Sequence, residues 1–299
     1  MHMTKIRAYG RMIASMLIFG TIGLFRRWIP LPSGMLACVR GLLGALSLFL
    51  FTRLRGREFQ RGIGRKTLLL LILSGGLMGF NWILLFEAYN YTTVAVATMC
   101  YYMAPTIVIL LSSLLFHERL TPIKLICAFL ALVGMVFLSG VAEGGGSGTS
   151  GFRGIACGLG AAALYASVVL LNKKIQLEDA YEKTILQLFS AAIILIPYVL
   201  LTEMPLNVSL DARAVGIILI VGLVHTGLAY ALYFGSMGAL RAQSIAVLSY
   251  IDPVFALFLS AAVLHEKMTP FGVLGAVLII ASALVSEAAG GRPSPSADE

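Results

Sequence analysis

One stretch of this chain occurs twice, 148 positions apart, and this repeat limits the possible folds more than any other feature. The matching residues are Pro105 and Pro253, His117-Glu118 and His265-Glu266, Thr121-Pro122 and Thr269-Pro270, Phe86 and Phe234, Tyr102 and Tyr250, and Ser112 and Ser260. Repetition at a fixed spacing is typical of a duplicated structural unit. The sequence therefore predicts two halves built on the same plan.

The composition is that of an integral membrane protein. Of the 299 residues, 59% are apolar and only 12% are charged, whereas soluble domains carry about 25% charged residues. The net charge of +8 does not indicate a nucleic-acid partner, because the basic residues lie in short loops and at helix ends. The four cysteines lack metal-ligand spacing, and no Walker-type phosphate loop occurs. We expect no metal, no cofactor and no ATP hydrolysis.

Ten apolar stretches have about the 20 residues that a helix needs to cross a bilayer. They are expected at 9–27, 33–52, 67–88, 93–116 and 121–141, and then at 153–172, 181–201, 213–236, 241–264 and 269–287. The predicted fold is all-α and integral to the membrane, with ten transmembrane helices as two five-helix repeats. Because five is odd, the second repeat is inverted, as in many secondary transporters.

The predicted domain boundaries follow from composition. Residues 1–141 form the first repeat and residues 153–287 the second, while the glycine- and serine-rich segment 142–152 is a flexible linker. The tail 288–299 is expected to be disordered. One such monomer is sufficient to contain a complete transport path.

The distribution of basic residues predicts the orientation. Sixteen Lys and Arg residues fall on the side that holds both termini and five on the other. Both termini should therefore face the cytoplasm, with the protein in the inner (plasma) membrane. Arg26-Arg27 contradicts this count, and we expect Trp28 beside them to anchor that pair at the outer interface.

Two runs, from Ala104-Pro105 to Pro122 and from Asp252-Pro253 to Pro270, share one pattern: a helix with a proline in mid-span ends in His-Glu-basic-apolar-Thr-Pro. In these runs the chain resembles ten-helix transporters of the EamA type in the drug/metabolite transporter superfamily. The resemblance implies export of amino acids, amines, drugs or other small metabolites. It says little about which substrate.

Asp252 is the sharpest candidate for a functional group, because a charge at membrane depth costs several kcal/mol. It lies near the middle of the stretch 241–264, directly before Pro253. Proline removes the helical donor of the Ser249 carbonyl, so polar backbone is exposed where a substrate ammonium or a proton could bind. The alternative is a structural contact with a neighbouring helix. The counterpart in the first half is Ala104.

Three further ionisable residues lie inside the stretches. Arg40 and Glu87 are at compatible depths and predict a buried ion pair, with an outer gate or a clamp for a substrate carboxylate as the functional alternative. The histidine side chain titrates near neutral pH in water, so His225 is either a proton-coupling group or a satisfied core residue. Thr226, Tyr230 and Tyr233 fall on or near one stripe at helical spacing, and His225 borders that stripe.

Polar aromatic side chains within the stretches predict the lining of a central cavity. Buried indole and phenol groups need hydrogen-bond partners, and these lie away from the interfaces where Trp and Tyr usually collect. The expected substrate-binding residues, besides Asp252 and His225, are Trp82 with its repeat counterpart Tyr230, Tyr102 with Tyr250, and Asn81, Tyr101 and Ser249. Packing against a neighbouring helix is the alternative for each of them.

The paired His-Glu sequences are not a zinc site, because His117-Glu118 and His265-Glu266 should lie on opposite membrane faces. Thr121-Pro122 and Thr269-Pro270 are typical helix starts. We expect Glu118 and Glu266 to lie near the N-termini of the two helices that follow them, where the helix dipole favours a negative charge.

The sequence thus favours a secondary transporter of a small-molecule substrate, an amino acid, an amine or a similar metabolite, that works by alternating access in a lipid bilayer. Proton exchange and facilitated diffusion both stay open. The alternatives from other classes are a membrane-embedded enzyme acting on lipid-linked substrates and a sensor that transports nothing.

Overall fold

The computed structural model describes residues 5–60, 62–116, 121–138, 149–204, 208, 210–237, 239–240 and 242–290. His117-Glu118, Arg61, residues 142–148 of the expected linker and residues 291–299 of the expected tail lie outside these ranges. The helices are α1 (Lys5–Gly20), α2 (Ile22–Arg26), α3 (Ser33–Leu54), α4 (Arg65–Tyr91), α5 (Val94–Tyr101), α6 (Ala104–Phe116), α7 (Pro122–Leu138), α8 (Thr149–Asn172), α9 (Ala180–Thr202), α10 (Ala212–Leu219), the π-helix η2 (Ile220–Leu228), α11 (Ala229–Met237), α12 (Ala242–Ser249), α13 (Ile251–Ala262) and α14 (Pro270–Gly290). Residues 149–152, expected as the end of the linker, instead form the first turn of α8.

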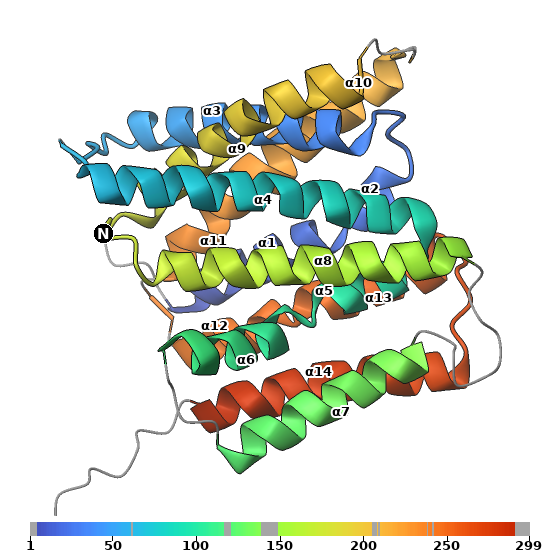
Figure 1. Ribbon diagram of the computed structural model, residues 1–299. Helices are drawn as coiled ribbons and strands as arrows, with labels where there is room; N and C mark the ends of the chain where they lie inside the picture. The colour runs from blue at the N-terminus through green and yellow to red at the C-terminus, as the bar shows by residue number, and fades with distance from the viewer. Residues whose placement is uncertain are drawn as a thin grey trace, which may run out of the picture.

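The prediction of an all-helical membrane bundle is confirmed. Within the described residues, seven helices are long and apolar enough to cross a membrane, and three shorter apolar helices complete the set. The spans run alternately in opposite directions, so that α1 begins and α14 ends on the same side of the bundle (Figure 1). We call this side the N-terminal face and the opposite side the far face.

The packing of the spans has the symmetry of the repeat. α4 of the first half packs on α8 of the second, as α11 of the second half packs on α1 of the first. In the same way α3 packs on η2 as α9 packs on α4. α5 and α6 cover α8 as α13 and α12 cover α1, while α7 pairs with its own counterpart α14. α1 and α8, which open the two halves, run in opposite directions (Figure 1). Each half is therefore completed by helices of the other.

Close approach between spans depends on glycine at particular places. A Cβ at Gly75 of α4 would lie 2.5 Å from the carbonyl oxygen of Gln187 in α9. A Cβ at Gly158 of α8 would lie 2.6 Å from the Cβ of Cys100 in α5. Small residues allow backbones to approach each other closely in a membrane, so these glycines allow the helices of the two halves to pack closely.

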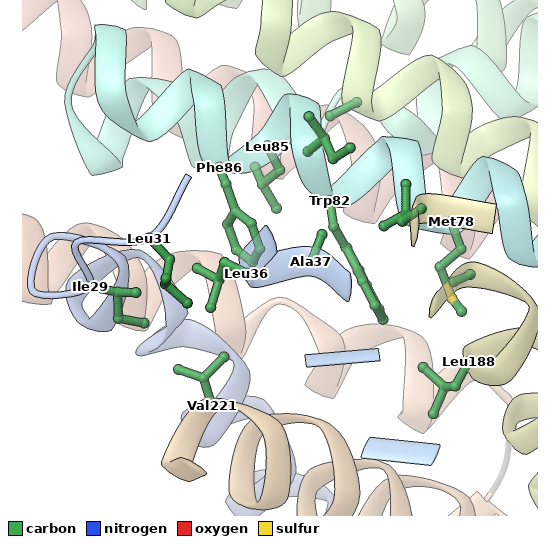
Figure 2. Packing of buried hydrophobic residues seen from close by; sticks show 14 of the residues in the cluster. Ile29, Leu31, Leu36, Ala37, Met78, Trp82, Leu85, Phe86, Leu188 and Val221 are labelled. Atoms are coloured by element: carbon green, nitrogen blue, oxygen red, sulfur yellow. The ribbon is translucent and has the colours of Figure 1, made fainter. Parts of the chain in front are cut away.

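The largest apolar cluster lies between α3, α4, α9 and η2. Figure 2 shows Trp82 and Phe86 projecting from α4 toward Leu36 and Ala37 of α3. Trp82 is 4% exposed and Phe86 is fully buried. The indole that the sequence placed in a cavity lining therefore packs mainly as part of the core.

Three spans that were expected as single helices are interrupted. Thr21 separates α1 from α2, Tyr102 and Met103 separate α5 from α6, and Tyr250 separates α12 from α13. The last two breaks stand at repeat-equivalent tyrosines, each three residues before a proline. Proline has no N–H to donate, so the helix cannot pass it with its hydrogen bonds intact.

The span before α12 is irregular in a different way. Between α10 and α11 the backbone widens into η2, which holds His225 and Thr226. The Thr226 hydroxyl donates to the carbonyl oxygen of Val221, five residues earlier, over 3.2 Å. π-helical turns within α-helices are rare and frequently occur at functional sites.

Candidate functional site

The four irregular segments meet one another. The hydroxyl of Tyr102, at the α5–α6 break, donates to Asp252 Oδ2 just after the α12–α13 break, over 2.7 Å. Thr21 Oγ1, at the α1–α2 break, is 2.7 Å from Nε2 of His225 in η2. A Cβ at Gly20 would lie 2.7 Å from the carbonyl oxygen of Asp252. Discontinuous helices that converge in this manner form the binding sites of many transporters.

Asp252 lies in the first turn of α13 and is half-buried. The positive end of the helix dipole favours its carboxylate there. Oδ2 accepts the bond from Tyr102, whereas Oδ1 has no hydrogen-bond donor among the described residues. Tyr102 belongs to the first half and Asp252 to the second, so this bond joins the repeats and leaves one carboxylate oxygen available.

Tyrosine rings surround this carboxylate. The ring centroid of Tyr102 is 6.4 Å from that of Tyr250 and 6.1 Å from that of Tyr101. Tyr101 lies 5.5 Å from Tyr165 of α8, and it interacts electrostatically with Tyr165, Tyr230 and Asp252. Tyr165 remains 42% exposed although it stands in the middle of α8. We call this group the tyrosine cluster (Tyr101, Tyr102, Tyr165, Tyr230 and Tyr250), and it therefore gathers phenol groups of both halves around Asp252.

Arg40 supplies the positive charge of this region. Its Nε donates to Thr226 Oγ1 over 2.9 Å, and its guanidinium lies 4.4 Å from the ring centroid of Trp82. Its electrostatic neighbours are the hydroxyls of Tyr230, Tyr101 and Tyr89. Arginine has five N–H donors, and Arg40 is within 4.0 Å of no carboxylate oxygen in the described part of the chain. It is therefore held in place by an aromatic ring and one hydroxyl, and has donors left for an anionic group.

The predicted ion pair between Arg40 and Glu87 is not formed. Glu87 Oε1 instead accepts from the hydroxyl of Ser33, which itself accepts from Arg26 Nη2 over 3.3 Å. Arg26 also donates to the carbonyl oxygen of Ile29 over 2.9 Å. The depths estimated for Arg40 and Glu87 were compatible, but depth alone does not show which faces of two helices meet.

His225 is 2% exposed and lies against the break in the first span. The Thr21 hydroxyl donates its one hydrogen to the carbonyl oxygen of Ile18 over 2.7 Å, so it accepts the bond from His225 Nε2. The imidazole also packs edge-on against Phe25, at 4.9 Å between ring centroids. This arrangement favours the interpretation of His225 as a structural residue that fixes η2 to the first span.

A second junction of the halves closes the far face. Glu266 Oε1 accepts from Arg27 Nη2 over 2.7 Å, and Oε2 accepts from the Val94 amide over 2.8 Å and from the Ser260 hydroxyl over 2.6 Å. Arg27 also donates to the carbonyl oxygen of Thr92 over 3.1 Å. We call this group of five residues the far-face clasp.

The far-face clasp corrects the prediction made for Glu266. Glu266 was expected at the N-terminus of the following helix, α14, but its carboxylate lies at the N-terminus of α5. His265 has a left-handed backbone, with φ of 54°, and the chain turns there so that the Glu266 amide donates to the carbonyl oxygen of Ser260 over 3.0 Å. Arg27, expected as an interface anchor, is its ion-pair partner.

Comparison with known proteins identifies this architecture. The sequence profile of the EamA-like transporter family matches residues 7–140 and again residues 152–287. The chain belongs to the EamA-like transporter family.

The relatives of this EamA-like transporter are themselves described only as transporters. It is 31% identical to the uncharacterized transporter YxxF of Bacillus subtilis strain 168, over 93% of this chain and 88% of the relative. It is 27% identical to an uncharacterized transporter of Archaeoglobus fulgidus, over 92% and 94% of the two chains. One crystal structure, 20% identical, matches with a TM-score of 0.65 over 93% of this chain and 97% of the other, which supports the fold.

Membership of the family decides between the functional classes that the sequence left open. The protein is a multi-pass membrane transporter and not an enzyme, and a transported small molecule is implied. The alternative of a membrane-embedded enzyme was wrong. Neither the substrate nor the direction of transport follows from the family.

Several predicted binding residues are occupied elsewhere in the EamA-like bundle. Asn81 is 1% exposed, and its side-chain amide donates to the carbonyl oxygen of Ala161 over 2.5 Å, so that it joins α4 to α8. Ser249 donates to the carbonyl oxygen of Ile245 over 2.9 Å, one turn back within α12. Trp82 supports Arg40. Tyr101, Tyr102, Tyr230, Tyr250 and Asp252 are the predicted residues that the fold brings into one region.

Proposed function

We propose that this EamA-like transporter moves amino acids or related amines through the tyrosine cluster by alternating access of its two halves. The observation that carries the proposal is the Tyr102–Asp252 bond at the meeting point of two interrupted helices. The free Oδ1 of Asp252 suits a substrate ammonium, and the remaining donors of Arg40 suit a carboxylate. Tyr101 interacts electrostatically with both of these charges, which supports one binding region between them.

The proposed setting is the cytoplasmic membrane, with the N-terminal face and both termini in the cytoplasm. The excess of Lys and Arg on that side supports this orientation. The direction of transport, export, rests on the resemblance to metabolite exporters alone. The coupling proposed here is to protons, with Asp252 as the group that exchanges them.

The proposal predicts saturable counterflow. Purified protein in lipid vesicles preloaded with an unlabelled amino acid should accumulate the labelled amino acid transiently, and the same amino acid should raise the melting temperature of the protein in detergent. A panel of amino acids, amines and nucleotides identifies the class. Stabilisation without any counterflow would instead indicate a sensor, and stabilisation by nucleotides alone would contradict the proposed substrate class.

Alternating access requires the far-face clasp to open during each cycle. α2, α5 and α13 pack on one another around the clasp, which supports a conformation that is closed on the far face. α6 and α12, the corresponding segments on the N-terminal face, pack chiefly on α8 and on α1 and α14. The Arg27–Glu266 pair should therefore break when the N-terminal face closes.

A reversible cross-link tests this gate. With the native cysteines replaced by alanine, Arg27→Cys and Glu266→Cys joined by a short bifunctional thiol reagent should lose at least about tenfold in transport. Binding of the substrate from the N-terminal face should persist in the melting assay, and reduction of the cross-link should restore transport. The single-cysteine variants treated alike are the control. Full transport by the cross-linked protein would show that this face does not open.

A further inference from the structure

The N-terminal face carries a pocket that the transport proposal does not use. Its volume is about 450 Å³, and its lining includes Arg11, Phe51, Arg55, Arg57, Tyr181 and Leu232. These side chains come from α1, the end of α3 and the loop that follows it, the start of α9, and α11. The α11 residues that line it lie on a different stripe from Tyr230 and Tyr233, which pack against Phe19 of α1. The pocket is therefore separate from the tyrosine cluster.

The pocket has more positive charge than the described residues neutralise. Arg57 pairs with Asp179 over 2.9 Å and stacks on the ring of Tyr181 at 4.6 Å. Arg55 lies over the ring of Phe51, at 5.2 Å. Neither Arg55 nor Arg11 has a carboxylate within 4.0 Å in the described part of the chain. Two guanidinium groups thus face the pocket without a negative partner.

The apolar part of the lining faces the surface that the lipid chains contact. Leu228 in the pocket is 47% exposed, and Leu50 and Leu54 on the adjoining surface of α3 are 58% and 79% exposed. Arg55 follows directly after α3 ends at Leu54. A span of this length begins and ends near the lipid headgroups, so the arginines stand at headgroup depth with leucines below them.

We propose that this pocket binds the phosphate group of an anionic phospholipid, with Arg11 and Arg55 contacting the phosphate. Arginine binds phosphate oxygens in a planar, two-pronged geometry, and basic pockets between transmembrane helices at this face suit anionic headgroups. The acyl chains lie along Leu228 and Leu54. A free phosphate anion carries the same phosphate oxygens as the lipid headgroup, but it has no acyl chain that could contact the leucines.

The test compares lipids of different headgroup charge on the full-length protein. Binding of phosphatidylglycerol and of phosphatidylcholine is measured by native mass spectrometry and by the shift in melting temperature in detergent. Wild type should prefer phosphatidylglycerol. The variant Arg11→Gln/Arg55→Gln should bind it about 25-fold more weakly, roughly fivefold for each arginine, with unchanged binding of phosphatidylcholine.

The control is Arg65→Gln/Lys66→Gln, which also removes two positive charges from the same face, outside the pocket. It should keep the preference for phosphatidylglycerol, and inorganic phosphate should not compete with the lipid at equal concentration. Equal loss in the control and the double variant would reduce the effect to general surface charge and overturn the proposal. Full competition by inorganic phosphate would do so too, because the ligand would then be a soluble anion. A folded double variant is recognised by an unchanged melting temperature in phosphatidylcholine.

Discussion

Asp252→Asn is expected to lower the rate of amino-acid counterflow by at least about 100-fold. Asparagine keeps the size of the side chain and can still accept from Tyr102, but it removes the negative charge that would bind an ammonium group. Losing the partner of a poorly solvated charge costs on the order of 3 kcal/mol, which corresponds to about two orders of magnitude in binding. Counterflow in lipid vesicles measures the loss.

The folded state of Asp252→Asn should be unaffected, with a melting temperature close to that of wild type in the absence of substrate. Any dependence of transport on pH should disappear along with the charge. Tyr102→Phe is the matched variant: it removes the donor to Oδ2 and leaves the carboxylate, so transport should fall much less. If Asp252→Asn transports as wild type does, with the same pH dependence, Asp252 has no part in the mechanism.

Arg40→Gln is expected to separate two kinds of substrate. If Arg40 binds the substrate carboxylate, amino acids should lose about 100-fold in affinity, because truncating one side of a desolvated charge pair typically costs 2–5 kcal/mol. Amines without a carboxylate should bind nearly as before, since Asp252 is unchanged. Binding of an amino acid and of the corresponding decarboxylated amine, measured side by side by melting-temperature shifts, gives the ratio.

Arg40→Lys is the conservative control for that experiment. Lysine keeps the charge but lacks the planar group that lies over Trp82 and bonds to Thr226, so an intermediate loss is expected. Thr226→Val tests the positioning of the guanidinium without altering charge. Equal losses for the amino acid and the amine in Arg40→Gln would mean that Arg40 supports the structure and not the substrate.

The membrane class, the repeat and the family could be recognised from the chain itself. Long apolar stretches have few alternatives to transmembrane helices, since unpaired backbone groups are very costly in lipid. The offset between Pro105 and Pro253 identified the two halves, and the same prolines explain why the breaks stand at Tyr102 and Tyr250. These prolines could also have predicted that each of the spans 93–116 and 241–264 consists of two helical segments and not one.

The candidate site was predicted in part. Asp252, Tyr101, Tyr102, Tyr230 and Tyr250 were each chosen because polar groups at membrane depth need a reason to be there, and they do gather in one region. Asn81 met the same criterion and instead joins α4 to α8. The free-energy cost of placing a polar group in the middle of the membrane indicates that the group has a partner. It does not show whether that partner is a substrate or a neighbouring helix.

The partners of Arg27 and Glu266 could not be predicted from the local sequence pattern. By sequence, Glu266 precedes α14 and suited that helix terminus, yet it lies at the start of α5, 172 positions earlier in the chain. The nearest charge along the chain therefore did not determine its partner.

Sequence alone determined the number of spans and their pairing into two inverted halves, because these depend on the hydrophobic length of each segment and on the fixed spacing of the repeat. Only the tertiary structure decided that Arg40 lies over Trp82 and not beside Glu87, that Tyr102 bonds to Asp252, and that Glu266 clasps the opposite half. Those contacts depend on the rotation of each helix about its own axis, which small differences in packing among ten apolar spans select together.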